Sequence, residues 1–229
     1  MDMRHVARGL AALALLSVTG CEVEGGGLQA IRSGLWDLDD SGSAWYSTWD
    51  SGDTSSLSGW EKVTCTVTYG DNYLLRELEA FKEPSSNADN FVARLRATCS
   101  EYEDVLGNYV TDLGGGTAST VFSGNYRTPG ATVEVSEAFG TLPVGVSLVV
   151  NPNSYVKDVK MRWVEDPSGG SNWDFNNVHV TAGATGYSGD PVALTCPDAY
   201  VITGVGVRYS TNTGKIRQFR IYCRELEDI

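Results

Sequence analysis

Tryptophans next to acidic residues are the side chains of this sequence that could best form a binding site. An indole ring packs on the C–H face of a sugar, and carboxylate oxygens accept hydrogen bonds from its hydroxyl groups. The alternative is that these tryptophans belong to the hydrophobic core of repeated elements. The candidate carbohydrate-binding residues are Trp36, Asp37, Trp45, Trp49, Trp173 and Asp174.

Residues for other chemistry are few. From Cys21 onward His179 is the only histidine, and no Gly-x-Ser-x-Gly motif occurs. Residues 37–42 carry oxygen ligands at alternate positions, as a calcium loop does, but the twelfth position is Thr48, where an EF-hand has Glu. We therefore expect an acidic turn at residues 37–42. For the whole chain we expect no enzymatic activity, no catalytic residue, no cofactor and no metal site.

The N-terminus has the features of an export signal. Arg4 and Arg8 precede an apolar stretch over residues 9–18, which is too short to span a bilayer. The next residues, Val18-Thr19-Gly20-Cys21, resemble the lipobox of bacterial lipoproteins. The resemblance implies a signal peptide over residues 1–20, cleavage before Cys21, and attachment of fatty acyl chains such as palmitate to Cys21. The alternative is an ordinary cleaved signal with an incidental cysteine.

The same resemblance implies a location in the bacterial cell envelope, with residues 21–34 as a flexible tether. Glu22 follows the lipobox cysteine, and the residue that resembles an inner-membrane retention signal is Asp, so the outer membrane is favoured. The formal net charge of −12 argues against nucleic acid and anionic lipid headgroups as partners. The expected partners are the membrane, through the lipid, and a glycan or another envelope protein.

Three stretches of the chain, about 35–104, 105–167 and 168–229, repeat one pattern. Val144-Gly145-Val146 superposes on Val205-Gly206-Val207 in this alignment. Four further positions match, namely an apolar residue (Val63, Val133, Leu194), an aromatic residue (Tyr69, Phe139, Tyr200), a basic residue (Arg96, Lys160, Arg220) and a glutamate (Glu101, Glu165, Glu225).

The repeat predicts how the four cysteines after Cys21 pair. The second copy has Val135 and Trp163 where the other two copies have cysteines. Because both positions are lost from one copy together, the partners should lie within a copy. We therefore predict two disulfides, Cys65–Cys99 and Cys196–Cys223, with the Trp163 ring filling the equivalent volume in the second copy.

The repeated segments read as strands, because apolar and polar residues alternate along them. Residues 73–82 have leucines at helical spacing and, taken alone, would be assigned to a helix. Their place in the repeat predicts a strand instead. The fold class is therefore all-β.

The third copy resembles the repeat of vitelline membrane outer layer proteins. The residues that carry the resemblance are Cys196-Pro197, the aliphatic segment 201–205, and the strand 216–223 that closes on Cys223. The resemblance implies a β-prism over residues 35–229, with three Greek-key sheets around a pseudo-threefold axis and one sheet per repeat. The rival fold is a β-sandwich, which threefold repetition disfavours.

Overall fold

The computed structural model of the 229-residue chain describes residues 29–31, 45–69, 73–82, 91–105, 108–111, 117–122, 131–134, 141–151, 154–165 and 173–228. Cys21, Trp36, Asp37 and the acidic turn 37–42 lie outside these ranges. The described elements are a short helix, α1 (Cys65–Tyr69), and the strands β1 (Gln29–Ile31), β2 (Trp45–Asp50), β3 (Glu61–Thr64), β4 (Tyr73–Lys82), β5 (Val92–Val105), β6 (Asn108–Thr111), β7 (Thr117–Phe122), β8 (Ala131–Glu134), β9 (Thr141–Asn151), β10 (Tyr155–Glu165), β11 (His179–Val180), β12 (Asp190–Thr195), β13 (Tyr200–Tyr209) and β14 (Ile216–Asp228).

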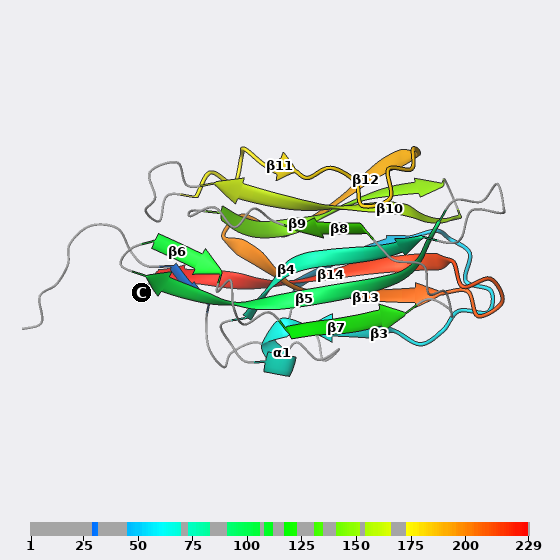
Figure 1. The fold of residues 1–229 in the computed structure, drawn as a ribbon, viewed down its shortest axis with the longest axis horizontal. Coiled ribbons are helices and arrows are strands. Elements are labelled where there is room, and N and C mark those ends of the chain that lie inside the picture. Colours follow the sequence, from blue (N-terminus) through cyan, green and yellow to red (C-terminus); the bar gives the residue numbers. More distant parts are fainter. Residues whose placement is uncertain are drawn as a thin grey trace, which may run out of the picture.

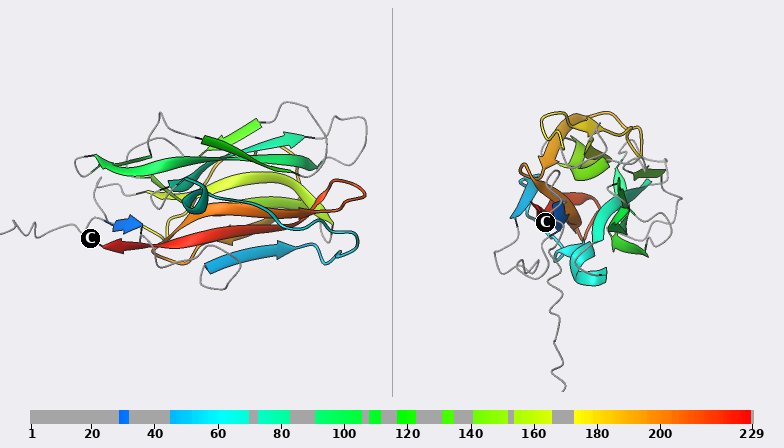
Figure 2. Two further views of the ribbon diagram at one scale, coloured as in Figure 1. Left: turned by 90° about the horizontal axis from the view of Figure 1, so that it is seen from below. Right: turned by 90° about the vertical axis from the view of Figure 1, so that its left-hand side faces the viewer.

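These strands form three antiparallel sheets, as a β-prism requires. Sheet I contains β4 to β8, sheet II contains β9 to β12, and sheet III contains β13, β14 and the N-terminal strands β1, β2 and β3. The strands of all three sheets run along the long axis of the molecule (Figure 1). Seen end-on, the sheets surround a common centre (Figure 2). The chain is thus an all-β prism.

Each sheet is a Greek key. Leaving aside the short strand β6, the spatial order in sheet I is β8, β4, β5, β7, so the last of these four strands returns to lie beside the first. Sheet II repeats this order as β12, β9, β10, β11. Sheet III repeats it as β3, β13, β14, β2, although its third and fourth strands come from the other end of the chain.

The expectation of one sheet per copy is wrong in one respect. Each copy supplies a central hairpin to one sheet, but the flanking strands of that sheet come from the next copy along the chain. Thus β8 flanks β4, and β12 flanks β9. The last hairpin, β13–β14, has no following copy, and β2 and β3 from the first copy complete its sheet. This exchange closes the ring and pairs strands that would otherwise be open edges.

The strand register establishes which residues are equivalent. Cys99, Trp163 and Cys223 pair with Leu75, Pro143 and Ile202, and in each hairpin the following residue is a β-bulge, at Arg76, Val144 and Thr203. The repeat is therefore real at the level of single residues. It also corrects the sequence alignment of the glycines, because Gly145 is equivalent to Gly204 and not to Gly206.

Gly145 and Gly204 are needed because a neighbouring strand passes very close to them. A Cβ atom at Gly145 would lie 2.2 Å from the carbonyl oxygen of Leu194 in β12. At Gly204 it would lie 2.4 Å from the carbonyl oxygen of Val63 in β3. Both contacts are with backbone, which cannot move aside as a flexible side chain can.

The core lies between the three sheets, and residues 73–82 contribute to it as strand β4. The predicted strand is thus confirmed. Leu75 and Leu78 both face the main core although they are three positions apart. The bulge at Arg76 adds one residue between them and changes the phase of the alternation. The helical spacing of the leucines is a consequence of this bulge.

Both predicted disulfides are present, and each joins two sheets. Cys65, directly after β3 of sheet III, bonds to Cys99 in β5 of sheet I. Cys196, directly after β12 of sheet II, bonds to Cys223 in β14 of sheet III. At the equivalent position of the second copy, Trp163 in β10 is partly buried against the core and stacks on His179 of β11, with ring centroids 4.4 Å apart.

Candidate functional site

Trp173 does not offer its ring to a ligand. Its exposed fraction is 8%, and it packs with Leu142, Val144 and Val164 in a second hydrophobic cluster. Asp174 is exposed, and its Oδ1 atom accepts a hydrogen bond of 3.1 Å from the backbone N–H of Asn176. The Trp-Asp pair is therefore a core residue followed by a turn residue. For Trp173 the alternative interpretation, that the tryptophan belongs to the hydrophobic core, is correct.

The other four candidate residues all lie in the first copy of the repeat. Trp49 lies in β2 opposite Phe219 and packs, partly buried, against the main core. Trp45 begins β2 and pairs with Cys223, and its side chain is not described. Trp36 and Asp37 lie outside the described ranges. Trp49 and Trp173, the two candidate tryptophans whose side chains are described, pack in different hydrophobic clusters.

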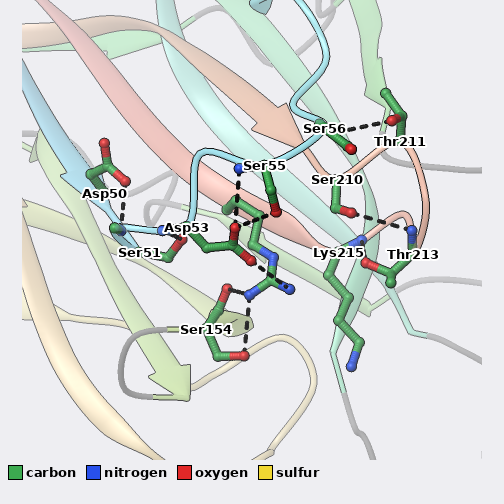
Figure 3. A network of polar contacts seen from close by, with 12 residues as sticks. Asp50, Ser51, Asp53, Ser55, Ser56, Ser154, Ser210, Thr211, Thr213 and Lys215 are labelled. Atoms are coloured by element: carbon green, nitrogen blue, oxygen red, sulfur yellow. Dashed lines mark hydrogen bonds and ion pairs between the residues drawn. The ribbon is translucent and has the colours of Figure 1, made fainter.

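A polar network covers the end of the prism where the hairpin turns lie (Figure 3). Asp53 accepts hydrogen bonds from the backbone N–H and the hydroxyl of Ser55, at 3.1 and 2.6 Å, and its carboxylate lies 3.4 Å from the guanidinium of Arg217. Arg217 also donates to the carbonyl oxygen and the hydroxyl of Ser154. The side-chain hydrogen bond from Ser55, its backbone N–H and then Arg217 hold the pKa of Asp53 below its usual 3.8.

This network holds the loop after β2 against the turn of the β9–β10 hairpin. Its charged groups, Asp53 and Arg217, already have partners within the protein, so we interpret the network as a structural contact and not as a ligand site. Three equivalent residues, one from each sheet's central hairpin, contact one another near this turn: Phe91, Tyr155 and Lys215. The Phe91 and Tyr155 rings are 6.0 Å apart, and the Lys215 amine lies 4.3 Å from the Tyr155 ring centre. This packing closes the end of the core.

The outer face of sheet III carries an open group of aromatic side chains in the described part of the chain. Tyr46 in β2 is 50% exposed, and Trp60, just before β3, is half-buried. The strand order places Arg220 of β14 between them, with its guanidinium carbon 4.3 Å from the Tyr46 ring centre and 4.2 Å from that of Trp60. We name Tyr46, Trp60 and Arg220 the aromatic–arginine cluster.

Two glycines of β13 form the floor beside this cluster. Gly204 pairs with Tyr222, and Gly206 pairs with Arg220. A Cβ atom at Gly206 would lie 3.2 Å from the Tyr222 hydroxyl and 3.4 Å from the Trp60 ring. The absence of a side chain at Gly206 therefore lets the Trp60 and Tyr222 rings lie close to the sheet.

Hydrogen-bonding groups surround the cluster. The Thr48 hydroxyl accepts a 3.0 Å hydrogen bond from Arg220 Nε. Gln218 donates from its amide nitrogen to the Asp50 carboxylate and accepts a 3.3 Å hydrogen bond from Arg208. Hydroxyl, amide and carboxylate groups of this kind bind the hydroxyl groups of a sugar. The face therefore combines flat apolar surface with polar groups at its border.

The equivalent positions on the other sheets lack this arrangement. Where sheet III has Tyr46 in its outer strand, sheet II has Val180, which is also exposed but not aromatic. Where sheet III has Arg220 opposite Gly206, sheet I has Arg96 opposite Glu79 and paired with it at 3.0 Å. Of the described parts of the three faces, only that of sheet III holds the aromatic–arginine cluster.

No metal centre occurs in the described ranges, where no group of three or more histidine, cysteine, aspartate or glutamate side chains converges. His179 stacks on Trp163, and its Nε2 atom is 3.9 Å from a carboxylate oxygen of Glu165. Within the same described part, no helix is long and apolar enough to cross a membrane.

No protein-family model matches the chain, and no curated protein matches it. Solved structures that match include a mannose-binding jacalin-related lectin from Ananas comosus (12% identity, TM-score 0.41, covering 80% of this chain and 98% of that chain). Calystegia sepium agglutinin matches with 10% identity, a TM-score of 0.43, and 74% and 95% of the two chains covered. The mosquito-larvicidal Cry4Aa toxin from Bacillus thuringiensis matches with 8% identity, a TM-score of 0.45, and 76% and 33% covered. At this level of likeness the fold assignment rests on the three sheets of this chain itself.

The aromatic–arginine cluster was not among the residues predicted from the sequence. The repeat does mark Arg220 as one of three equivalent basic residues, and Tyr46 and Trp60 lie close in sequence to the candidate residues Trp45 and Trp49. What the sequence does not indicate is that β2 and β3 pair with β14 and β13, so that Thr48 bonds to a residue 172 positions away.

Proposed function

We propose that this chain is a carbohydrate-binding module without catalytic activity, and that the glycan lies on the outer face of sheet III. The observation that carries the proposal is the aromatic–arginine cluster on its glycine floor. A half-exposed tyrosine and a half-buried tryptophan supply apolar surface for sugar C–H groups. Thr48 and Asp50, which are both exposed, supply hydrogen-bonding groups within the same face.

The proposal predicts that Tyr46→Ala weakens glycan binding about fivefold, because an aromatic contact contributes about 1 kcal/mol. Trp60→Ala should weaken it at least as much, since it removes the larger ring. The measurement is a glycan array with the full-length protein in detergent, followed by titration of the glycans that bind. Melting temperatures should establish that each variant is folded.

Val180→Ala is the matched control, because Val180 is the exposed residue equivalent to Tyr46 on sheet II. It should leave binding unchanged. Equal losses for Tyr46→Ala and Val180→Ala would contradict the assignment of the site to sheet III. A folded wild-type protein that binds no glycan on the array would contradict carbohydrate binding altogether.

The second candidate function is a structural or protein-interaction role, in which the prism is a stable surface body. The burial of Trp173 and the packing of Trp49 against the core favour it, because they remove two of the predicted sugar contacts. This second function would be favoured if the folded protein binds no glycan on the array.

We also propose that the protein is a lipoprotein of the bacterial cell envelope, anchored through Cys21 and facing the periplasm or the cell surface at the outer membrane. The lipobox-like sequence 18–21 supports this proposal. Radiolabelled fatty acid should label the wild-type protein in growing cells and should not label Cys21→Ala. Equal labelling of the two proteins would refute the anchor.

A further inference from the structure

We infer that the ligand of sheet III is an oligosaccharide chain and not a single sugar, with one of its sugar units on Tyr46 and another on Trp60 at the same time. This inference rests on the proposed function and specifies the ligand class of the same face. It comes from the way the two aromatic rings are spaced around Arg220.

Tyr46 and Trp60 reach Arg220 from opposite sides. Tyr46 lies in β2, which pairs with one side of β14, whereas Trp60 precedes β3, which lies beyond β13 on the other side of β14. The guanidinium carbon of Arg220 lies 4.3 Å from the Tyr46 ring centre and 4.2 Å from that of Trp60. Its Nε atom donates to the Thr48 hydroxyl at 3.0 Å. The two ring centres therefore cannot be farther apart than the sum of the two ring distances, and a guanidinium group lies between them.

A single sugar cannot use both rings. A pyranose ring is similar in size to the phenol ring of tyrosine, so one sugar covers one aromatic ring when it stacks on it. Contact with the second ring requires another sugar unit on the far side of the guanidinium. Tyr46 is half-exposed and Trp60 is half-buried, so each side chain keeps accessible surface for one such contact.

The two rings are held in place by a series of contacts. A second guanidinium carbon, that of Arg208, lies 6.0 Å from the Trp60 ring centre, and Arg208 Nε donates to the Ser58 carbonyl oxygen at 2.8 Å. The contacts thus run in the order Tyr46, Arg220, Trp60, Arg208. Because guanidinium groups are planar and stack on aromatic faces, these contacts preserve the spacing of the rings before a ligand binds. A site ordered in advance costs less free energy to occupy.

A chain gains more from two aromatic contacts than a free sugar gains from one. The loss of translational and rotational freedom opposes binding once for each ligand, however many contacts that ligand makes. A second contact on the same chain forms at a high effective concentration. One aromatic contact, worth about fivefold in affinity, is a small gain for a monosaccharide on the face of a sheet.

In the described part of the chain, the other two sheets carry different groups at the equivalent positions. Sheet II has Lys160 and Val180 there. Sheet I has Arg96, whose guanidinium carbon lies 5.5 Å from the ring centre of Phe81, a buried residue. Variants on sheets I and II therefore serve as controls.

The test uses the glycan of three or more sugars that the wild-type protein binds most tightly on the array. Its one-sugar and three-sugar fragments are titrated into the full-length protein in detergent. We expect the three-sugar fragment to bind at least about fivefold more tightly than the one-sugar fragment, because it adds the second aromatic contact. This length-dependent gain should disappear in Tyr46→Ala and in Trp60→Ala, since each variant keeps only one ring. Val180→Ala should preserve the gain.

A second variant tests Arg220 as the group that spaces the rings. Arg220→Lys keeps the positive charge but removes the planar group between the rings. It should lower the length-dependent gain at least about twofold, whereas Arg96→Lys on sheet I should leave the gain unchanged. A full gain in Arg220→Lys would overturn this role of the guanidinium.

Two outcomes would overturn the inference and leave carbohydrate binding standing. The first is a one-sugar fragment that binds within about twofold of the three-sugar fragment, or an array on which only monosaccharides bind. The second is a length-dependent gain that survives both Tyr46→Ala and Trp60→Ala, because the second contact would then lie elsewhere. A folded protein that binds no glycan at all would instead contradict the proposed function, and the inference with it.

Discussion

Replacing Asp158 by alanine should lower the free energy of unfolding by about 3 to 5 kcal/mol. Asp158 lies in β10 with an exposed fraction of 1%. Its Oδ1 atom accepts hydrogen bonds from the backbone N–H groups of Val159 and Thr185, at 2.8 and 2.7 Å, and Oδ2 accepts one from Gly186 at 3.1 Å. Alanine would leave these donors without their acceptor, and an unsatisfied buried donor costs about 1 to 3 kcal/mol.

The expected effect is large because Asp158 holds a whole loop against sheet II. The loop around Thr185 and Gly186 continues from β11 along the edge of β10, and the Thr185 hydroxyl donates to the Lys157 carbonyl oxygen at 2.9 Å. Gly183 lies so close that an added Cβ atom would be 2.0 Å from the Asp158 carboxylate. The loop backbone is therefore shaped around this one side chain.

Urea unfolding monitored by circular dichroism would measure the effect, with Asp174→Ala as the matched control. Asp174 is exposed, and the hydrogen bond that its side chain accepts is to its own turn, so its loss should cost less than about 1 kcal/mol. Asp158→Asn should lie between the two, because the amide keeps one acceptor oxygen and adds a donor. If Asp158→Ala is no less stable than Asp174→Ala, the loop does not depend on the buried carboxylate.

Much of the fold could be predicted because the repeat carries information that no single segment does. The local pattern of residues 73–82 favours a helix, whereas the bulge at Arg76 explains the same spacing within a strand. The paired loss of cysteines in the second copy identified both disulfides for a similar reason. Comparison of the copies showed which features recur because each sheet needs them, such as the strand at 73–82, and which features are local to one segment, such as the helical spacing of its leucines.

The site could not be predicted in the same way, because it depends on strand exchange between copies. The sequence places Tyr46 and Trp60 in the first copy and Arg220 in the third, and pairing of the chain ends brings them together. The Trp-Asp pattern was misleading for a physical reason. A core tryptophan followed by a turn-forming aspartate, as at Trp173 and Asp174, has the same residue types as a sugar site.

Removing the Cys196–Cys223 disulfide should cost about 3 to 4 kcal/mol, because the bond closes a loop with a sequence separation of 27. The bond connects sheet II to sheet III, and sheet III is the one completed by strands from both ends of the chain. The double variant Cys196→Ala with Cys223→Ala tests this without leaving an unpaired thiol. Denaturant unfolding should show a lower midpoint with native circular dichroism at zero denaturant.

The matched control is Cys65→Ala with Cys99→Ala, whose loop has a separation of 34. In the chain-entropy model the two variants should lose nearly equal stability, since the cost depends only weakly on loop length. The second copy of the repeat has no cysteine, so no third disulfide of this kind can form, and Trp163 is packed there against the core. A loss far below 3 kcal/mol in both variants would mean that packing holds all three junctions and that the disulfides add little. A much larger loss for Cys196–Cys223 alone would locate the dependence in the junction between sheets II and III, because the Cys65–Cys99 bond also attaches to sheet III.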